Sequence, residues 1–195
     1  MTASRSFGSP VETIGELEEA LANHVARAGE KMRRFGLLVT EMEVFLQTNR
    51  FRKDDPQYSP VVGITLDFPT HSTAELMTAA RTLLQRIYRP GYRYKKTGIQ
   101  LLNLVSEDDY QPSLFHPPST LSESGRIDVD KIVDEINRRL GDPRNPVITR
   151  AAQGVERPGE SRRGWKMKAD RHSPHYTTDW NQLPVARTEP PRPRP

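Results

Sequence analysis

One segment of the sequence has residue types that suit contact with a polyanion: Tyr92-Arg93-Tyr94-Lys95-Lys96. Its cations can neutralise phosphates and release counterions, and its tyrosine hydroxyls can hydrogen-bond a phosphate oxygen. The same segment also fits a solvated basic turn whose tyrosines are half-buried on the domain. Composition alone leaves both interpretations open.

A second segment, Gln111-Pro112-Ser113-Leu114-Phe115, places an adjacent Leu and Phe in a polar stretch. An exposed apolar pair in a polar stretch favours contact with an apolar surface of a partner. The alternative is that Leu114 and Phe115 fold back onto the domain that precedes them.

Groups suited to catalysis or metal binding are sparse. The chain has no cysteine, which excludes a thiol nucleophile, a disulfide scaffold and a Cys-ligated zinc site. His172 and His175 flank Pro174 and cannot share a helical face, so they make a poor metal site. The run Glu107-Asp108-Asp109 is interpreted as a solvated acidic linker. We therefore expect no catalytic residue, no metal site and no cofactor.

The composition predicts one compact core and a poorly packed remainder. The 195 residues are 34% hydrophobic and 28% charged, with a net charge of +4, which is polar for one packed globule of this length. No apolar run approaches the roughly 20 residues that span a bilayer, and the first residues lack the apolar region of a signal peptide. We expect a cytoplasmic protein without membrane contact.

The elements that must position these segments follow from periodicity and capping. Thr13 with Glu16 and Ser72 with Glu75 form two capping boxes, each followed by an apolar helical stripe. Leu38, Thr40, Met42, Val44 and Leu46 alternate with a second set of residues, as in a strand with one buried face. The second set is Val39, Glu41, Glu43, Phe45 and Gln47. The predicted elements are strand 4–11, helix 14–35, strands 38–47 and 62–68, helix 73–87, strand 99–105 and helix 128–140.

This β-α-β-β-α-β order predicts an α+β fold: a four-stranded sheet with two helices on one face, followed by a loop-rich extension with one helix. The other face of the sheet is polar and free to meet a partner. It carries Glu41, Glu43, Gln47, Thr65 and Gln100.

Several longer strings resemble the little-finger domain of UmuC-type Y-family DNA polymerases, the catalytic subunits of bacterial DNA polymerase V and its relatives. They are Ser4-Arg5-Ser6-Phe7-Gly8, Asn49-Arg50-Phe51-Arg52, Phe68-Pro69-Thr70 and the run from Gly91 to Gly98. Trp165-Lys166-Met167 and the run from Ser173 to Trp180 resemble the C-terminal extension of the same family. The resemblance covers about residues 3 to 187.

The resemblance implies a division into a little-finger domain (1–107), a linker with a clamp-binding motif (108–118), a C-terminal extension (119–187) and a Pro/Arg tail (188–195). Such a polymerase also has a palm domain whose carboxylates hold two Mg²⁺ ions, and we expect this chain to lack it and to be non-catalytic. The implied function is DNA binding and sliding-clamp tethering for translesion synthesis, in SOS mutagenesis and DNA repair. The resemblance thereby also implies a nucleoid-associated protein.

The implied partners are primer–template DNA, the bacterial sliding clamp, a UmuD-type accessory subunit and a separate palm-bearing chain. Gln111 to Phe115 resembles the clamp-binding pentapeptide, with Pro112 in place of the usual Leu, and its contacts are expected from Gln111, Ser113, Leu114 and Phe115. The residues expected to contact the DNA backbone are Ser4, Arg5, Ser6, Arg50, Arg52, Lys53, Tyr92, Arg93, Tyr94, Lys95 and Lys96.

An alternative hypothesis is a stand-alone nucleic-acid-binding module with the topology of an RNA-recognition motif. That fold stacks bases on aromatic residues of its two central strands. No Lys/Arg-Gly-Phe-like aromatic string occurs on any predicted strand, and the open face carries Glu41 and Glu43.

Overall fold

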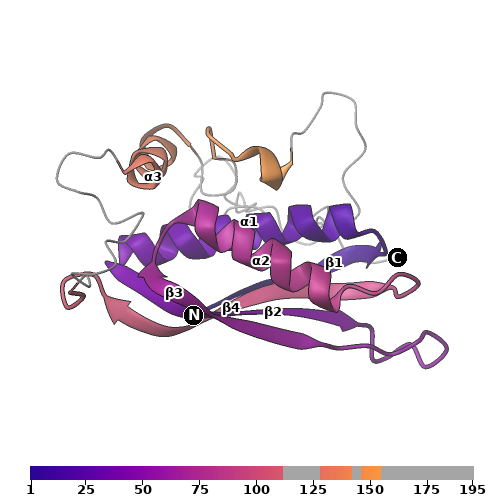
Figure 1. Ribbon diagram of the computed structural model, residues 1–195. Coiled ribbons are helices and arrows are strands. Elements are labelled where there is room, and N and C mark those ends of the chain that lie inside the picture. Colours follow the sequence, from indigo (N-terminus) through magenta and orange to yellow (C-terminus); the bar gives the residue numbers. More distant parts are fainter. Residues whose placement is uncertain (112–127, 142–145, 155–195) are drawn as a thin grey trace, which may run out of the picture.

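The computed structural model describes residues 1–111, 128–141 and 146–154, which form a four-stranded antiparallel sheet with helices on one side (Figure 1). The predicted α+β fold and its order of elements are confirmed. The elements are β1 (Thr2–Val11), α1 (Ile14–Arg34), β2 (Leu37–Thr48), β3 (Val61–Thr70), α2 (Thr73–Ile87), β4 (Tyr94–Ser106), α3 (Val129–Leu140) and one 3₁₀ turn, η1 (Ala151–Gln153).

Side-chain hydroxyls begin both long helices, as the capping pattern predicts. Thr13 Oγ1 accepts a hydrogen bond from the amide of Glu16 at 3.4 Å, and Ser72 Oγ accepts one from the amide of Glu75 at 3.5 Å. The Glu16 carboxylate accepts from the Thr13 hydroxyl at 2.6 Å, so it reinforces the cap through the side chain. After α1, Gly36 adopts a φ of +61°, a left-handed conformation that glycine reaches without strain.

Strands β4 and β2 lie at the centre of the sheet, whose order is β1-β4-β2-β3. β4 begins at Tyr94, earlier than the predicted start at Ile99, because its first residues already pair with both neighbours. Lys96 pairs with Gln47 and Tyr94 pairs with Thr48, so the register shifts by one residue at Lys95. The basic segment is therefore largely part of a central strand.

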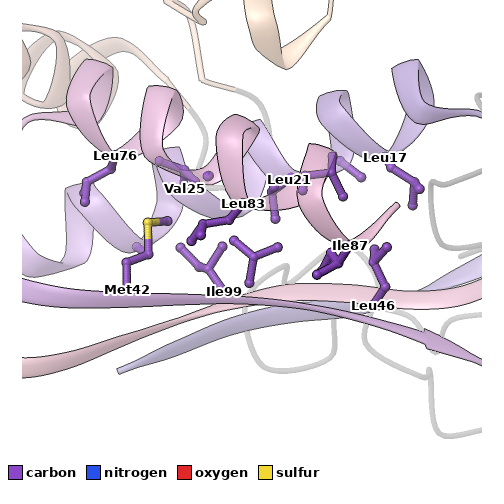
Figure 2. Packing of buried hydrophobic residues seen from close by; sticks show 14 of the residues in the cluster. Leu17, Leu21, Val25, Met42, Leu46, Leu76, Leu83, Ile87 and Ile99 are labelled. Carbon is purple, nitrogen blue, oxygen red and sulfur yellow. The ribbon is translucent and has the colours of Figure 1, made fainter. Parts of the chain in front are cut away.

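The apolar core fills the space between the sheet and the two helices. Figure 2 shows side chains from both helices pointing down onto side chains from β2 and β4. Each large side chain buried in this way contributes about 1.5–3 kcal/mol. The labelled residues are Leu17, Leu21 and Val25 of α1, Leu76, Leu83 and Ile87 of α2, Met42 and Leu46 of β2, and Ile99 of β4.

The predicted alternation along β2 is wrong at its first residues. Val39 is buried next to Leu38, whereas Thr40 is only half-buried and donates its hydroxyl to the carbonyl of Asn103 at 3.0 Å. Asn103 has a φ of +47°, and the pairing of β2 with β3 shifts register between Val39 and Glu41. Irregular pairing thus changes which residues point inward.

Helix α3 is confirmed and lies on the outer side of α1, away from the sheet (Figure 1). Its contact is polar. Arg33 of α1, with 5% of its side chain exposed, donates to both carboxylate oxygens of Asp134 at 2.6 and 2.9 Å. Asp130 accepts from the amide of Thr73, the first residue of α2, at 2.8 Å. The acidic face of α3 therefore docks onto the helix layer.

The apolar residues of α3 pack on this domain only in part. Val129, Ile132 and Leu140 are exposed, while Val133 and Ile136 are half-buried. The pattern identified the helix correctly, but the acidic residues on its other side make the contact with Arg33.

Candidate nucleic-acid interface

The open face of the sheet carries two cross-strand rows at one end. Val44 and Leu46 of β2 point into the core, so their neighbours Phe45 and Gln47 lie on the opposite face. Directly paired residues of antiparallel strands share a face. The pairings therefore build one row from Ser6, Lys96 and Gln47 and a second from Ser4, Gly98 and Phe45.

Gly98 has no side chain, so the side chains of Ser4 and Phe45 can approach each other across β4. A Cβ atom at this position would lie 2.3 Å from Cβ of Ser4 and 2.7 Å from Cζ of Phe45, which is too close for any side chain. The ring of Phe45 also lies 5.6 Å from Nζ of Lys96, within reach of a cation–π interaction. The ring thus helps to hold the Lys96 ammonium on the open face, next to the hydroxyl groups of β1.

The other end of the open face is acidic. Glu41 and Glu43 line a shallow depression together with Gly63, Thr65 and other residues of β2, β3 and β4. Asn103 donates to Glu41 at 2.6 Å. A polyanion is repelled by this end and attracted by the end that carries Lys96.

The predicted DNA contact is wrong for Tyr94. Its side chain is 0% exposed, and its hydroxyl donates to the carbonyl of Arg89 at 2.9 Å and accepts from the Arg89 amide at 3.0 Å. Burial raises the pKa of Tyr94. Tyr92 is half-buried against the core, with its ring centroid 4.9 Å from that of Tyr58. The alternative interpretation, tyrosines packed on the domain, describes these side chains better.

The three cations of the segment have different partners. Arg93 forms ion pairs with Glu12 at 3.3 Å and with Asp55 at 3.6 Å. Lys95 donates to a backbone carbonyl of β1 at 2.5 Å. Lys96 makes no ion pair within the described part of the chain. Among the described residues, Arg93 is thus the only cation of the segment that has a carboxylate partner.

Arg5 lies on the helix side of the sheet, away from Ser4 and Ser6. It pairs with Thr97, which is buried on the helix-covered face. Close by, His24 of α1 is 7% exposed, and its Nε2 has no hydrogen-bond partner among the described residues. Burial, together with the charges of Arg27 and Arg5, lowers the pKa of His24 to about 4. Arg5 thus lies on the side of α1, where its charge affects His24, and it does not contribute to the open face.

The loop between β2 and β3 brings Arg50, Arg52 and Lys53 to the cationic end of the sheet. All three side chains are exposed. Figure 1 shows this loop and the turn between α2 and β4 at the same end of the molecule. Asp55 joins the two, since it pairs with Arg52 at 3.8 Å and with Arg93 at 3.6 Å.

Of the segment predicted to bind the sliding clamp, Gln111 to Phe115, the structure describes only the first residue. Gln111 is exposed and follows the end of β4 by a few residues. Ser113, Leu114 and Phe115 lie outside the described residues, as do His172 and His175.

The acidic run after β4 contacts the docked helix. Glu107 accepts from Nζ of Lys131 at 3.0 Å and lies 3.7 Å from Nε2 of His71.

Within residues 1–111, 128–141 and 146–154, no group of three or more His, Asp or Glu side chains is placed to hold a metal ion. In the same residues, no helix combines the length and apolar character required to cross a bilayer.

Three residues at this end were not among the predicted DNA contacts. Phe45 and Gln47 complete the cross-strand rows. Arg89 places its guanidinium 4.7 Å above the ring of Tyr58. The sequence signal for Phe45 was an apolar residue on the polar face of a strand, whereas Arg89 stood beside a turn and carried no distinguishing pattern.

The elements form a small α+β domain whose sheet is covered by helices on one face and is polar on the other. Residues 1–114 match the impB/mucB/samB family C-terminal domain. This match covers more than half of the chain, so the chain belongs to that family. Residues 128–186 match a domain of unknown function, DUF4113.

Two relatives extend the likeness over nearly the whole chain. Protein UmuC of Salmonella typhimurium (strain LT2) is 30% identical over 183 residues, which are 94% of this chain and 41% of that protein. Protein MucB of Salmonella typhimurium is 31% identical over 186 residues, 95% of this chain and 41% of that protein. The chain thus spans about 41% of their length, and the resemblance to UmuC-type proteins is confirmed.

Among solved structures, a complex of the beta-clamp processivity factor with the little finger domain of PolIV is similar. It shows 17% identity and a TM-score of 0.40, covering 57% of this chain and 91% of that one. The likeness is partial, and the family assignment rests on the sequence matches.

Proposed function

We propose that the chain is the DNA-binding and sliding-clamp-tethering part of a translesion DNA polymerase of the UmuC type. Family membership and the relatives named UmuC and MucB support the polymerase context. The observation that carries the DNA-binding role is the row Ser6, Lys96 and Gln47 on the open face, at the cationic end of the sheet.

This row suits a phosphate backbone rather than a base sequence. Lys96 supplies a cation, Ser6 a hydroxyl and Gln47 an amide, all three of which can donate to phosphate oxygens. Such contacts carry no sequence information, and each neutralised phosphate releases counterions. The domain therefore binds primer–template DNA without sequence preference and with an affinity that falls steeply as salt rises.

The test replaces Lys96 with Ala and compares Lys31→Ala, which removes an exposed lysine from α1 on the covered side of the sheet. Lys96→Ala should weaken binding to several unrelated duplexes alike. It should also reduce the slope of log affinity against log salt by about 0.9 for the lost phosphate contact. Equal effects of the two changes would point to net charge alone and would contradict an interface on the open face.

The tethering role rests on Gln111 to Phe115, and it is supported by the place of this motif directly after the last strand of the domain. A peptide that inserts Leu114 and Phe115 into an apolar pocket of the clamp would keep the domain beside DNA. The cost of ordering the peptide limits such an interaction to roughly micromolar strength, about 8 kcal/mol.

In this proposal the catalytic residues belong to a palm domain, such as that of a separate palm-bearing chain. A UmuD-type accessory subunit is a further partner, expected from the resemblance. The purified chain should extend no primer when dNTPs and Mg²⁺ are added. Primer extension that copurifies with the chain through several columns would overturn this assignment.

The RNA-recognition-motif alternative is not favoured by the central strands. That fold stacks bases on aromatic side chains of its sheet, and here the central strands are β2 and β4. The open face of β2 and β4 presents Glu43, Gln47, Lys96 and Gln100 with one aromatic residue, Phe45. One aromatic side chain on these two strands is too few for the base-stacking surface of an RNA-recognition motif.

A further inference from the structure

Phe51 is the most exposed of the large apolar side chains in the described residues, at 88%. It lies in the loop between β2 and β3, between Arg50 and Arg52 and close to Lys53. An aromatic ring left in water gains nothing for folding, so its position calls for an explanation outside the core.

The loop that carries Phe51 is internally bonded. The Asn49 side chain accepts from the amide of Phe51 at 3.1 Å. The side-chain Nε2 of Gln57 lies within hydrogen-bond distance of the carbonyl oxygens of Asn49 at 3.2 Å, Arg52 at 2.9 Å and Asp55 at 2.9 Å, and its two hydrogens are shared among them. These bonds link the two ends of the loop to its middle, so the backbone that carries the exposed Phe51 has a defined conformation.

The charges around the ring favour a polyanionic partner. Asp55 is shared by Arg52 and Arg93. Arg50 and Lys53 make no ion pair within the described part of the chain. An exposed ring with uncompensated cations on both sides is the combination that binds single-stranded nucleic acid, because every base offers a π-face and phosphates flank it.

We propose that Phe51 stacks on an unpaired base of a nucleic acid strand while Arg50 and Lys53 contact the neighbouring phosphates. The inference rests on the proposed function, because the loop begins directly after the end of β2, where Gln47 pairs with Lys96. A strand whose duplex part crosses the open face reaches the loop where it becomes single-stranded. The ligand class is a single strand or a single-stranded template overhang.

The experiment measures binding of the full chain to three probes: a single-stranded deoxythymidine oligonucleotide, an abasic oligonucleotide of equal length and a blunt duplex. The variants are Phe51→Ala, Phe51→Trp and the matched control Phe35→Ala. Phe35 is a second exposed phenylalanine, at 59%, with the Arg34 guanidinium 5.6 Å from its ring, at the opposite end of the sheet.

Phe51→Ala should weaken binding of the deoxythymidine strand by roughly fivefold to a hundredfold, the range for loss of one stacked base. Phe51→Trp should restore it, and Phe35→Ala should leave it unchanged. On the abasic strand, which keeps the phosphates and lacks the bases, Phe51→Ala should have no effect. In Phe51→Trp, the new indole fluorescence, taken as a difference from the parent, should change with the deoxythymidine strand and not with the abasic one.

Two results would overturn the inference while leaving the proposed function intact: an equal loss on the abasic strand, or no loss on the deoxythymidine strand while duplex binding stays salt-dependent. A parent chain that binds none of the three probes would contradict both. Because the Trp variant keeps an aromatic ring, its fluorescence decides the question even if Phe51→Ala disturbs the loop.

Discussion

His24 should make the stability of this domain depend on pH between about pH 6.5 and 4. The imidazole is buried in α1, and burial together with Arg27 and Arg5 lowers its pKa from 6.5 to about 4. In that pH range the unfolded chain binds a proton that the folded chain does not. Stability is therefore fully present above pH 6.5 and decreases as the pH falls towards 4.

The size of the effect follows from the pKa difference. Each pKa unit corresponds to about 1.4 kcal/mol, so a fall from 6.5 to about 4 removes about 3 kcal/mol of unfolding free energy. This is a large share of the roughly 5–15 kcal/mol by which domains are stable. Below pH 4 both states bind the proton, and this contribution has no further slope.

The assay is urea unfolding at a series of pH values for the parent, for His24→Leu and for Asn23→Ala. Asn23 neighbours His24 and donates to the carbonyl of Gln153 at 3.0 Å, so its loss should give an offset that does not vary with pH. The difference between parent and His24→Leu should change by about 3 kcal/mol between pH 7.5 and pH 4. Parallel curves for these two proteins would refute the reasoning.

Three further predictions concern the sheet, α3 and the tether. Gly98→Ala should lower the unfolding free energy by about 1–3 kcal/mol, because the new Cβ meets Ser4; an unchanged urea midpoint would contradict this. Arg33→Met should raise hydrogen exchange in residues 129–140 and not in the sheet, because a buried ion pair holds α3; unaltered exchange would show other docking contacts. Replacing Leu114 and Phe115 with Ala should weaken clamp binding by about 3 kcal/mol or more, roughly a hundredfold. The melting temperature of the double variant should equal that of the parent. If it falls, and the parent itself does not bind the clamp, Leu114 and Phe115 belong to the core.

Local signals in the sequence predicted the elements and their order well. The helix starts depend on groups three residues apart, such as Thr13 with Glu16 and Ser72 with Glu75, and the apolar stripe of each helix identifies the side that faces the core. Gly36 likewise marks the end of α1 through its own backbone conformation. These interactions lie within one turn of chain, so the sequence contains everything needed to infer them.

The composition of the candidate site was decided by strand pairing. Lys96 stands beside Ser6 and Gln47 only because β4 lies between β1 and β2 in this register. A shift of one residue turns a side chain to the other face of the sheet. For that reason Arg5 faces α1 and Tyr94 lies in the core, although both stand in strings that looked suited to DNA.

Helix α3 shows the same division between local and tertiary causes. Its periodicity and the Asp128 cap were sufficient to predict a helix, but they did not determine which side of the helix contacts the domain. Arg33 lies 101 residues from Asp134 in the chain, and their contact turns the acidic side inward. A buried guanidinium requires an anionic partner, and only the folded helix layer creates that requirement.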